Sequence, residues 1–228
     1  MKTGTLKEWL ARAGREHWAV PHFNISNFVQ LKGILNACAE ARSPVMIGTS
    51  EGEAEFIGYR TALHMVVAAA EETGLPVFLN ADHFHSFEKT REAMAAGYGS
   101  VLIDCSKKSR AENEEITRNV VECARNMGAD VSVEGELGYL VTDSSKIYKE
   151  AIEIPPESLT DPDEAREFVR STGIDRFAPA VGTLHGIAAN VKKLDMERIR
   201  RIREALPSEV AMVLHGGSGT PEEQIREA

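Results

Sequence analysis

The sequence alternates between short apolar runs and stretches of helical periodicity along nearly its whole length, and this alternation most constrains the fold. Seven apolar runs are typical of buried strands: residues 19–24, 45–50, 77–82, 100–104, 130–137, 176–182 and 210–216. Six stretches between them have the period of a helix: residues 28–41, 61–73, 86–96, 111–127, 163–171 and 195–205. Strands that alternate with helices predict a parallel sheet joined by helical crossovers.

Residues that start and stop helices agree with this pattern. Asp161-Pro162 and Thr220-Pro221 each place a capping side chain and then a proline where a helix should begin. Glycines follow the expected helix ends at Gly74, Gly97, Gly128 and Gly173. We therefore expect helices to fill the segments between the strands.

The positions of the polar residues distinguish a closed barrel from a doubly wound sheet. Each of the following lies at or just beyond the end of a strand: Asn24, Ser50, Asp82 with His83, Asp104, Glu136, His185 and His215. Barrels collect catalytic groups at the carboxyl ends of many strands, whereas an open sheet concentrates them near one crevice. No glycine-rich dinucleotide motif follows the first strand. We therefore predict a (β/α)8 TIM barrel, with residues 1–228 forming a single domain and residues 138–159 forming a mobile loop over its mouth.

Composition excludes several classes of partner. The chain has 228 residues and a formal net charge of −9, which disfavours binding to nucleic acid or to an anionic membrane. No apolar run approaches the roughly 20 residues that span a bilayer, and the first residues form an amphipathic segment without an apolar core. The three cysteines, Cys38, Cys105 and Cys123, form no pair of metal-binding or disulfide spacing. We expect a cytoplasmic protein with reduced thiols and a small-molecule substrate.

Three histidines predict a metal site. His83 lies in ADHFH, His185 in GTLHG and His215 in HGGSG, each at the end of a different expected strand. Three neutral imidazoles can hold zinc with one coordination position open, which is the catalytic form of a zinc site. One such histidine alone would more often be an ordinary core or surface residue, but three at equivalent positions favour the metal. His85 could form an H-x-H pair with His83, although we favour a supporting or loop role for it.

Two further features suggest the chemistry at this site. Asp82 ends an otherwise apolar strand, where an unpaired carboxylate is costly, so it is a candidate acid/base; the alternative is an acceptor that orients an imidazole. The glycines of HGGSG let backbone amides approach an anion closely. They follow the seventh strand, where barrels often bind phosphate, and precede an expected helix start.

Taken in order along the chain, these segments resemble the class II fructose-bisphosphate aldolases and their tagatose-bisphosphate relatives. The resemblance covers nearly the whole sequence. It rests on FNISN at 23–27, GTSEG at 48–52, the DH of ADHFH, IDCS at 103–106, VEGELG at 133–138, GTLHG and LHGGSG.

The resemblance implies a role for each matching residue. His83, His185 and His215 would bind the catalytic zinc, and Asp82 would be the catalytic acid/base. Asp104 and Glu136 would surround a second or displaced metal position, although on their own they could equally anchor loops. The positions that would contact the substrate are Asn24, Ser50, Gly186, Gly216, Gly217 and Ser218. The family also implies a phosphosugar substrate, room for a monovalent cation, and a homo-oligomer, either a dimer or a tetramer.

The sequence departs from the family pattern at several points. Phe84 stands where relatives have a glycine, and YLVTDSSKIYKE at 139–150 replaces an acidic, glycine-containing loop. No residue here matches the loop glutamate that removes the ketose-phosphate proton. Pro179 and Leu184 alter the motif of the sixth strand, so specificity is expected to shift. The sequence ends before the eighth strand and the Asn-x-Asp-Ser/Thr motif of the family, so we expect the barrel to be incomplete at its C-terminus.

The reaction we expect is the reversible cleavage of a phosphorylated ketose, such as fructose 1,6-bisphosphate, into dihydroxyacetone phosphate and an aldehyde. The RFAPAVG strand at 176–182 has no lysine for a covalent mechanism, although Lys107 and Lys108 keep that alternative open. Two other functions remain open. One is a metal-dependent phosphosugar epimerase or isomerase on the same barrel, and the other is a catalytically degenerate barrel with a binding role.

Overall fold

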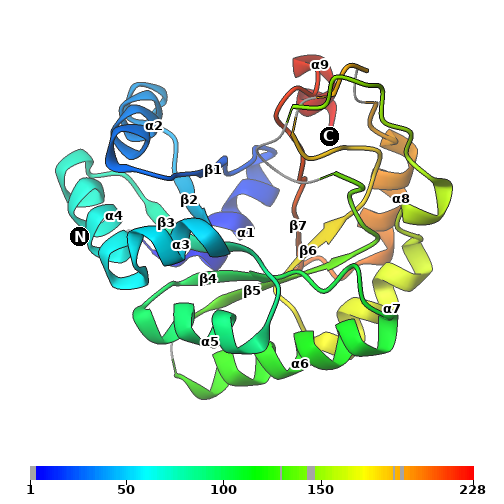
Figure 1. The fold of residues 1–228 in the computed structure, drawn as a ribbon, viewed down its shortest axis with the longest axis horizontal. Coiled ribbons are helices and arrows are strands. Elements are labelled where there is room, and N and C mark those ends of the chain that lie inside the picture. The colour runs from blue at the N-terminus through cyan, green and yellow to red at the C-terminus, as the bar shows by residue number, and fades with distance from the viewer. Residues whose placement is uncertain (1–3, 129, 143–146, 187, 191–192) are drawn as a thin grey trace.

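The chain forms a single parallel sheet whose strands follow one another in sequence order. The computed structural model describes residues 4–128, 130–142, 147–186, 188–190 and 193–228 (Figure 1). Seven strands pair in the order β1 to β7, and every pairing is parallel. They are β1 (His22–Asn24), β2 (Val45–Ser50), β3 (Val77–Phe84), β4 (Ser100–Ile103), β5 (Ser132–Leu137), β6 (Arg176–Pro179) and β7 (Ala211–Met212).

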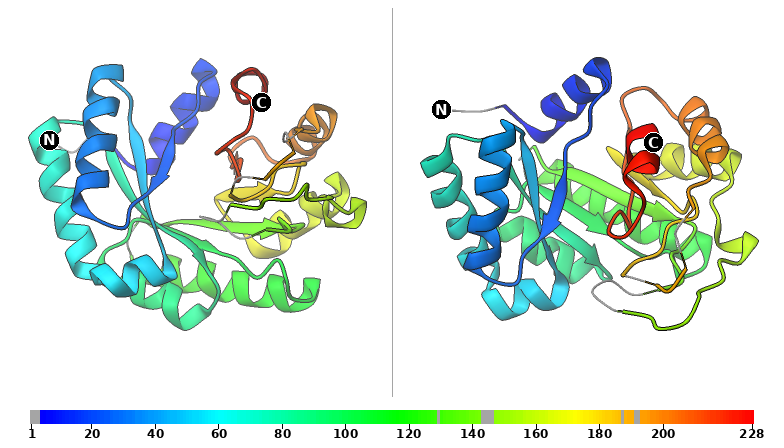
Figure 2. Two further views of the ribbon diagram at one scale, coloured as in Figure 1. Left: turned by 45° about the horizontal axis from the view of Figure 1, so that its top comes forward. Right: turned by 90° about the horizontal axis from the view of Figure 1, so that it is seen from above.

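Helices connect the strands and surround the outside of the sheet. The main ones are α1 (Leu6–Glu16), α2 (Phe28–Ala41), α3 (Glu51–Ile57), α4 (Tyr59–Thr73), α5 (Phe87–Ala96), α6 (Arg110–Asn126), α7 (Pro162–Thr172), α8 (Met196–Ala205) and α9 (Glu222–Glu227), with a short 3-10 helix η1 (Pro156–Ser158). Figure 2 shows the sheet curled, with most of the helices that connect strands arranged around its convex side and with α1 and α9 beside the open gap between the first and last strands. No helix in the described part of the chain is long and apolar enough to cross a membrane.

The strand order excludes a doubly wound sheet, in which the order reverses at a switch point. Consecutive parallel strands that curl in one direction form a half-barrel instead. Within the described residues β1 and β7 do not pair with each other, so the half-barrel is not closed. Because all seven strands run in the same direction, their carboxyl ends lie along one rim.

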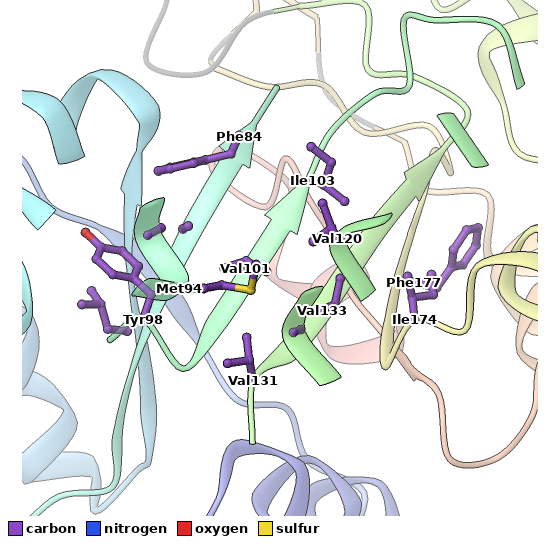
Figure 3. Close-up of a cluster of buried hydrophobic side chains, with 14 of the residues drawn as sticks. Phe84, Met94, Tyr98, Val101, Ile103, Val120, Val131, Val133, Ile174 and Phe177 are labelled. Atoms are coloured by element: carbon purple, nitrogen blue, oxygen red, sulfur yellow. The ribbon is translucent and has the colours of Figure 1, made fainter. Parts of the chain in front are cut away.

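An apolar layer joins the sheet to the helices. Val101, Ile103 and Val133 point from β4 and β5 toward Met94 of α5 and Val120 of α6, and all five side chains are buried (Figure 3). Burying such side chains contributes roughly 1.5–3 kcal/mol each. This layer fixes the strands that carry the polar residues of the rim.

Phe84 belongs to the same apolar layer (Figure 3). Its side chain is fully buried at the end of β3, and its ring lies 6.2 Å from that of Tyr59 in an edge-to-face arrangement. Phe84, which we expect to depart from the family pattern, therefore packs into the core.

The opposite, interior face of the sheet is polar at its centre. Five buried polar side chains of β3 to β6 lie there: Asn80, Ser100, Ser132, Glu134 and Arg176. Burial of polar groups is tolerated only where they are paired, and these side chains bond to one another.

Several predicted boundaries are confirmed and others were wrong. Strand β2 and helix α2 have the predicted bounds, and Asp161 caps α7 with Pro162 as its first residue. Strand β1 starts later than predicted, and β6 and β7 end earlier, because strand pairing covers only part of each apolar run. The loops that carry His185 and His215 therefore begin earlier than expected.

Two helix starts differ from the prediction. Helix α3 was not predicted; it begins after Ser50, whose side chain and Glu53 form a reciprocal capping box. Thr220 was expected to cap α9, but Pro221 occupies that position and no side chain caps the helix. The Thr220 hydroxyl donates to the Gly216 carbonyl oxygen instead, which stabilises the turn after His215. Residues 143–146 of the predicted mobile loop lie outside the described residues.

Candidate metal centre

Three histidines from different strands meet at the rim. His83 lies at the end of β3, His185 follows β6 and His215 follows β7. One ring nitrogen from each lies within 4.8 Å of those of the other two. The ring centroid of His83 is 4.6 Å from that of His185 and 4.5 Å from that of His215. The structure thus brings together the three residues that the sequence selected as zinc ligands.

The backbone of β3 is irregular where it enters the site. Pairing with β4 shifts register between Ala81 and Phe84, and His83 has a φ of 50°, in the left-handed region. Non-glycine residues adopt this conformation at an energetic cost and often do so at functional sites. The irregularity allows the adjacent Asp82 and His83 side chains, which a regular strand would send to opposite faces, both to join the rim.

Contacts with carboxylates indicate which ring nitrogens of His83 and His215 carry protons. His83 Nδ1 lies 2.9 Å from Asp104 Oδ2, and His215 Nε2 lies 2.7 Å from Glu134 Oε1. Carboxylates only accept, so these two nitrogens donate. When both imidazoles are neutral, the other nitrogens, His83 Nε2 and His215 Nδ1, therefore present lone pairs to each other.

These two nitrogens are only 3.1 Å apart. Two facing lone pairs at this distance need a cation or a shared proton between them. Two nitrogens bound tetrahedrally to one zinc ion at about 2.0–2.1 Å would lie roughly 3.3 Å apart. The donor set therefore fits a zinc ion.

His185 is suited to the same role because it stays neutral. Burial and, to a smaller extent, the neighbouring His83 and His215 together lower its pKa to about 3. A neutral imidazole keeps the lone pair that a metal requires.

Two carboxylates form a second group beside His83. Ligand atoms of Asp104, Glu136 and His83 lie within 4.8 Å of one another. Glu136 Oε2 is buried and has no hydrogen-bond partner among the described residues. Burial raises the pKa of Glu136 well above its usual value, and the nearby Asp104 raises it further. A cation here would relieve both effects, which suits the second or displaced metal position expected for Asp104 and Glu136.

Asp82 is a buried carboxylate with one free oxygen. Its side chain is 7% exposed, Oδ2 accepts a 2.9 Å hydrogen bond from Asn24 Nδ2, and Oδ1 has no partner among the described residues. Burial raises the pKa of Asp82, but the neighbouring imidazoles outweigh this effect and hold it below the usual range. An ionised carboxylate with a free oxygen can accept a proton.

Gly48 on β2 makes room for this arrangement. A Cβ atom at Gly48 would lie 2.4 Å from Asn24 Oδ1 and 2.4 Å from His22 Nε2. Asn24, predicted to contact the substrate, therefore reaches Asp82 only because its neighbour has no side chain. His22 lies in the same polar region, 3.3 Å from Asn80 Nδ2.

The other predicted substrate positions lie around the same mouth. Ser50 Oγ accepts from Glu53 N at 3.3 Å and so caps α3. Gly186 and Gly216 have φ values of 67° and 72°, and a Cβ at Gly216 would lie 2.5 Å from the Leu184 carbonyl oxygen. Gly217 and Ser218 continue the turn after His215. Their contacts with substrate stay predictions.

His85 lies apart from the three histidines. Its Nδ1 is 3.1 Å from the Asp104 carbonyl oxygen, and its backbone N–H donates to Glu51 Oε2 at 3.1 Å. These contacts favour the supporting role over an H-x-H metal pair.

Two buried residues that were not predicted from the sequence lie next to the site: Glu134 bonds to His215, and Arg176 pairs with Glu134. Glu134 and Arg176 are each 1% exposed, and Arg176 Nη1 lies 2.6 Å from Glu134 Oε2. Signals for both were present in the sequence. Glu134 has the same alternation phase as Glu136, and Arg176 is a charge at the start of an apolar strand.

Comparison with known proteins identifies the family. The fructose-bisphosphate aldolase class-II family matches residues 4–228. A fructose-bisphosphate aldolase of Geobacillus stearothermophilus is 40% identical over 231 residues, covering 100% of this chain and 77% of the relative. A fructose-bisphosphate aldolase of Staphylococcus epidermidis is 37% identical, covering 98% and 76%.

Solved structures agree with the sequence relatives. The crystal structure of the YdjI aldolase from Escherichia coli K12 superposes with a TM-score of 0.80 at 32% identity, covering 98% of this chain and 76% of that one. Fold, rim residues and sequence relatives all point to enzymes that break carbon-carbon bonds with the help of a metal. The chain belongs to the class II fructose-bisphosphate aldolase family.

Proposed function

We propose that this chain is a metal-dependent aldolase that reversibly cleaves a phosphorylated ketose such as fructose 1,6-bisphosphate into dihydroxyacetone phosphate and an aldehyde. One observation carries the proposal. The lone pairs of His83 Nε2 and His215 Nδ1 face each other 3.1 Å apart, next to His185 and the buried carboxylate of Asp82. The two named relatives, both fructose-bisphosphate aldolases, support this choice of substrate.

His83, His185 and His215 would hold zinc. When bound, zinc supplies a Lewis acid that draws electron density toward the ketose carbonyl. Asp104 and Glu136 would serve a second or displaced metal position, and a monovalent cation remains part of the proposal.

Asp82 would carry the proton on the aldehyde side of the reaction. In cleavage its free Oδ1 takes the proton from the hydroxyl group of the carbon that becomes the aldehyde. The bond between that carbon and its neighbour breaks, and its electron pair stays with the ketose-phosphate half. In condensation the same proton returns to the aldehyde oxygen. Asn24 holds Oδ2, so Oδ1 stays directed to the reaction.

Backbone groups would bind the phosphate-bearing half of the substrate. Gly186, Gly216 and Gly217 lie beside the metal ligands, and closely spaced amides in such turns bind anions. We also infer that the architecture is that of a single (β/α)8 barrel domain, in which an eighth strand would join the unpaired edges of β1 and β7. The homo-oligomer stays a prediction.

Removal of the metal should abolish cleavage. We expect dialysis against a strong zinc chelator to eliminate cleavage of fructose 1,6-bisphosphate in an assay of triose-phosphate release, and added zinc to restore it, because no described residue replaces the Lewis acid.

Borohydride added with substrate should leave activity intact, since no lysine Schiff base forms.

Full activity in metal-free protein would refute the proposal, and so would inactivation by borohydride. Exchange of substrate protons without triose release would identify an epimerase or isomerase instead.

A further inference from the structure

Arg176 is a fully buried cation in the interior of the half-barrel, below the three histidines. Its guanidinium uses donors in several directions. Nη1 pairs with Glu134 Oε2 at 2.6 Å, Nε donates to Ser132 Oγ at 3.1 Å, and Nη2 donates to Asn80 Oδ1 at 3.2 Å and to Ser100 Oγ. The planar fork of arginine can satisfy these acceptors together, which a lysine could not.

Glu134 connects this cation to a metal ligand. One carboxylate oxygen binds Arg176 and the other accepts from His215 Nε2 at 2.7 Å. With both oxygens engaged, the carboxylate has a fixed position and a fixed direction. The neutral imidazole of His215 then carries its proton on Nε2, which leaves Nδ1 for the metal.

We propose that Arg176 is a positioning residue of the metal centre: it anchors Glu134, and through Glu134 it holds His215 in the tautomer and orientation that present Nδ1 to the metal. This inference rests on the metal-dependent function proposed above. Carboxylates that accept from a metal-bound imidazole commonly tune metal affinity. Here the carboxylate is itself held by a charge 42 residues away in the sequence.

The alternative is that Arg176 only fills the polar interior. It bonds to Ser132, Asn80 and Ser100, and within the described residues none of these three forms a hydrogen bond with His83, His185 or His215. If Arg176 only fills the interior, its replacement should lower the stability of the fold but leave the zinc affinity of the folded molecules unchanged. A positioning role predicts weaker zinc binding.

The test measures zinc affinity by competition with a chromophoric chelator, so it needs no substrate and no activity. We expect Arg176→Met to bind zinc about 10- to 100-fold more weakly than the wild type. Arg203→Met is the matched control. Arg203 is a partly buried arginine of α8 that donates to the carbonyl oxygens of Leu206 and Val210 in the turn before β7, and within the described residues it has no hydrogen bond to Glu134 or His215. Its removal should leave zinc affinity unchanged.

A double-mutant cycle shows whether Arg176 acts through Glu134. Glu134→Gln should weaken zinc binding to a similar degree, and adding Arg176→Met should weaken it little further, since the anchored carboxylate is already gone. Nitrogen NMR of histidine-labelled, metal-free protein should show His215 protonated on Nε2 in the wild type and a mixture of tautomers in Arg176→Met. If the losses of zinc affinity in the two single variants add in the double variant, the inference is overturned.

Arg176→Lys keeps the test decisive if Arg176→Met does not fold. It retains the buried positive charge but cannot hold Glu134 and the three other acceptors together, so zinc affinity should still fall measurably. Wild-type zinc affinity in either folded variant would overturn the positioning role and leave the proposed function intact. A wild-type protein that binds no zinc would overturn both.

Discussion

Asp82→Asn should lower the rate of fructose 1,6-bisphosphate cleavage by at least about 10²-fold while zinc stays bound. Asparagine keeps the shape of the side chain and its hydrogen bond to Asn24 can reform, but an amide cannot take up and return a proton. The free oxygen of Asp82 is buried beside the three histidines, so water cannot easily replace it. Steady-state cleavage and zinc content, measured on the same preparation, test this prediction.

A second reaction provides the internal control for this variant. Exchange of the dihydroxyacetone phosphate proton with solvent needs the metal and a separate base, but it does not need proton transfer at the aldehyde oxygen. We expect Asp82→Asn to slow this exchange much less than it slows cleavage. Equal losses would mean that Asp82 orients the metal site, and unchanged cleavage would remove Asp82 from the mechanism.

His83→Ala and His215→Ala should each abolish tight zinc binding. Either change leaves only two of the three imidazoles, and it also removes one of the two nitrogens that lie 3.1 Å apart. Metal content after dialysis gives the direct readout. Zinc should raise the melting temperature of the wild type, because a ligand at 100 times its Kd stabilises the folded protein by about 2.7 kcal/mol. It should not raise the melting temperature of either variant, because neither binds it.

His85→Ala is the matched control for these variants. It removes a histidine from the same ADHFH segment, two residues from His83, whose ring bonds to a backbone carbonyl. Its zinc content and zinc-dependent melting should match the wild type. Full zinc occupancy in both His83→Ala and His215→Ala would contradict the three-histidine assignment.

Features that depend on local sequence could be predicted well. Strand β2 is a continuous apolar run and α2 has a clear helical period, so both have the predicted bounds. The order of strands and the rim positions of His83, His185 and His215 followed from the same periodicity, because parallel strands place their carboxyl ends together.

Features that depend on distant partners could not be predicted. Strand β7 is only Ala211–Met212, because its length is set by pairing with β6 and not by its own apolar run. The pairing of Glu134 with Arg176 could not be predicted, because a charged residue within a strand does not indicate its partner. The two residues lie 42 positions apart in the sequence. The capping box of α3 is visible in the sequence, but its Ser50 also belongs to the GTSEG segment that predicts substrate contact, which hides its role as a helix cap.

The most direct test of the metal centre is anomalous diffraction at the zinc absorption edge from crystals of the wild-type protein loaded with zinc. We predict one strong peak bounded by His83 Nε2, His215 Nδ1 and a ring nitrogen of His185, at about 2.0–2.1 Å from each. A zinc peak held elsewhere, or no peak among these three rings, would contradict the assignment of this chain as a metal-dependent aldolase.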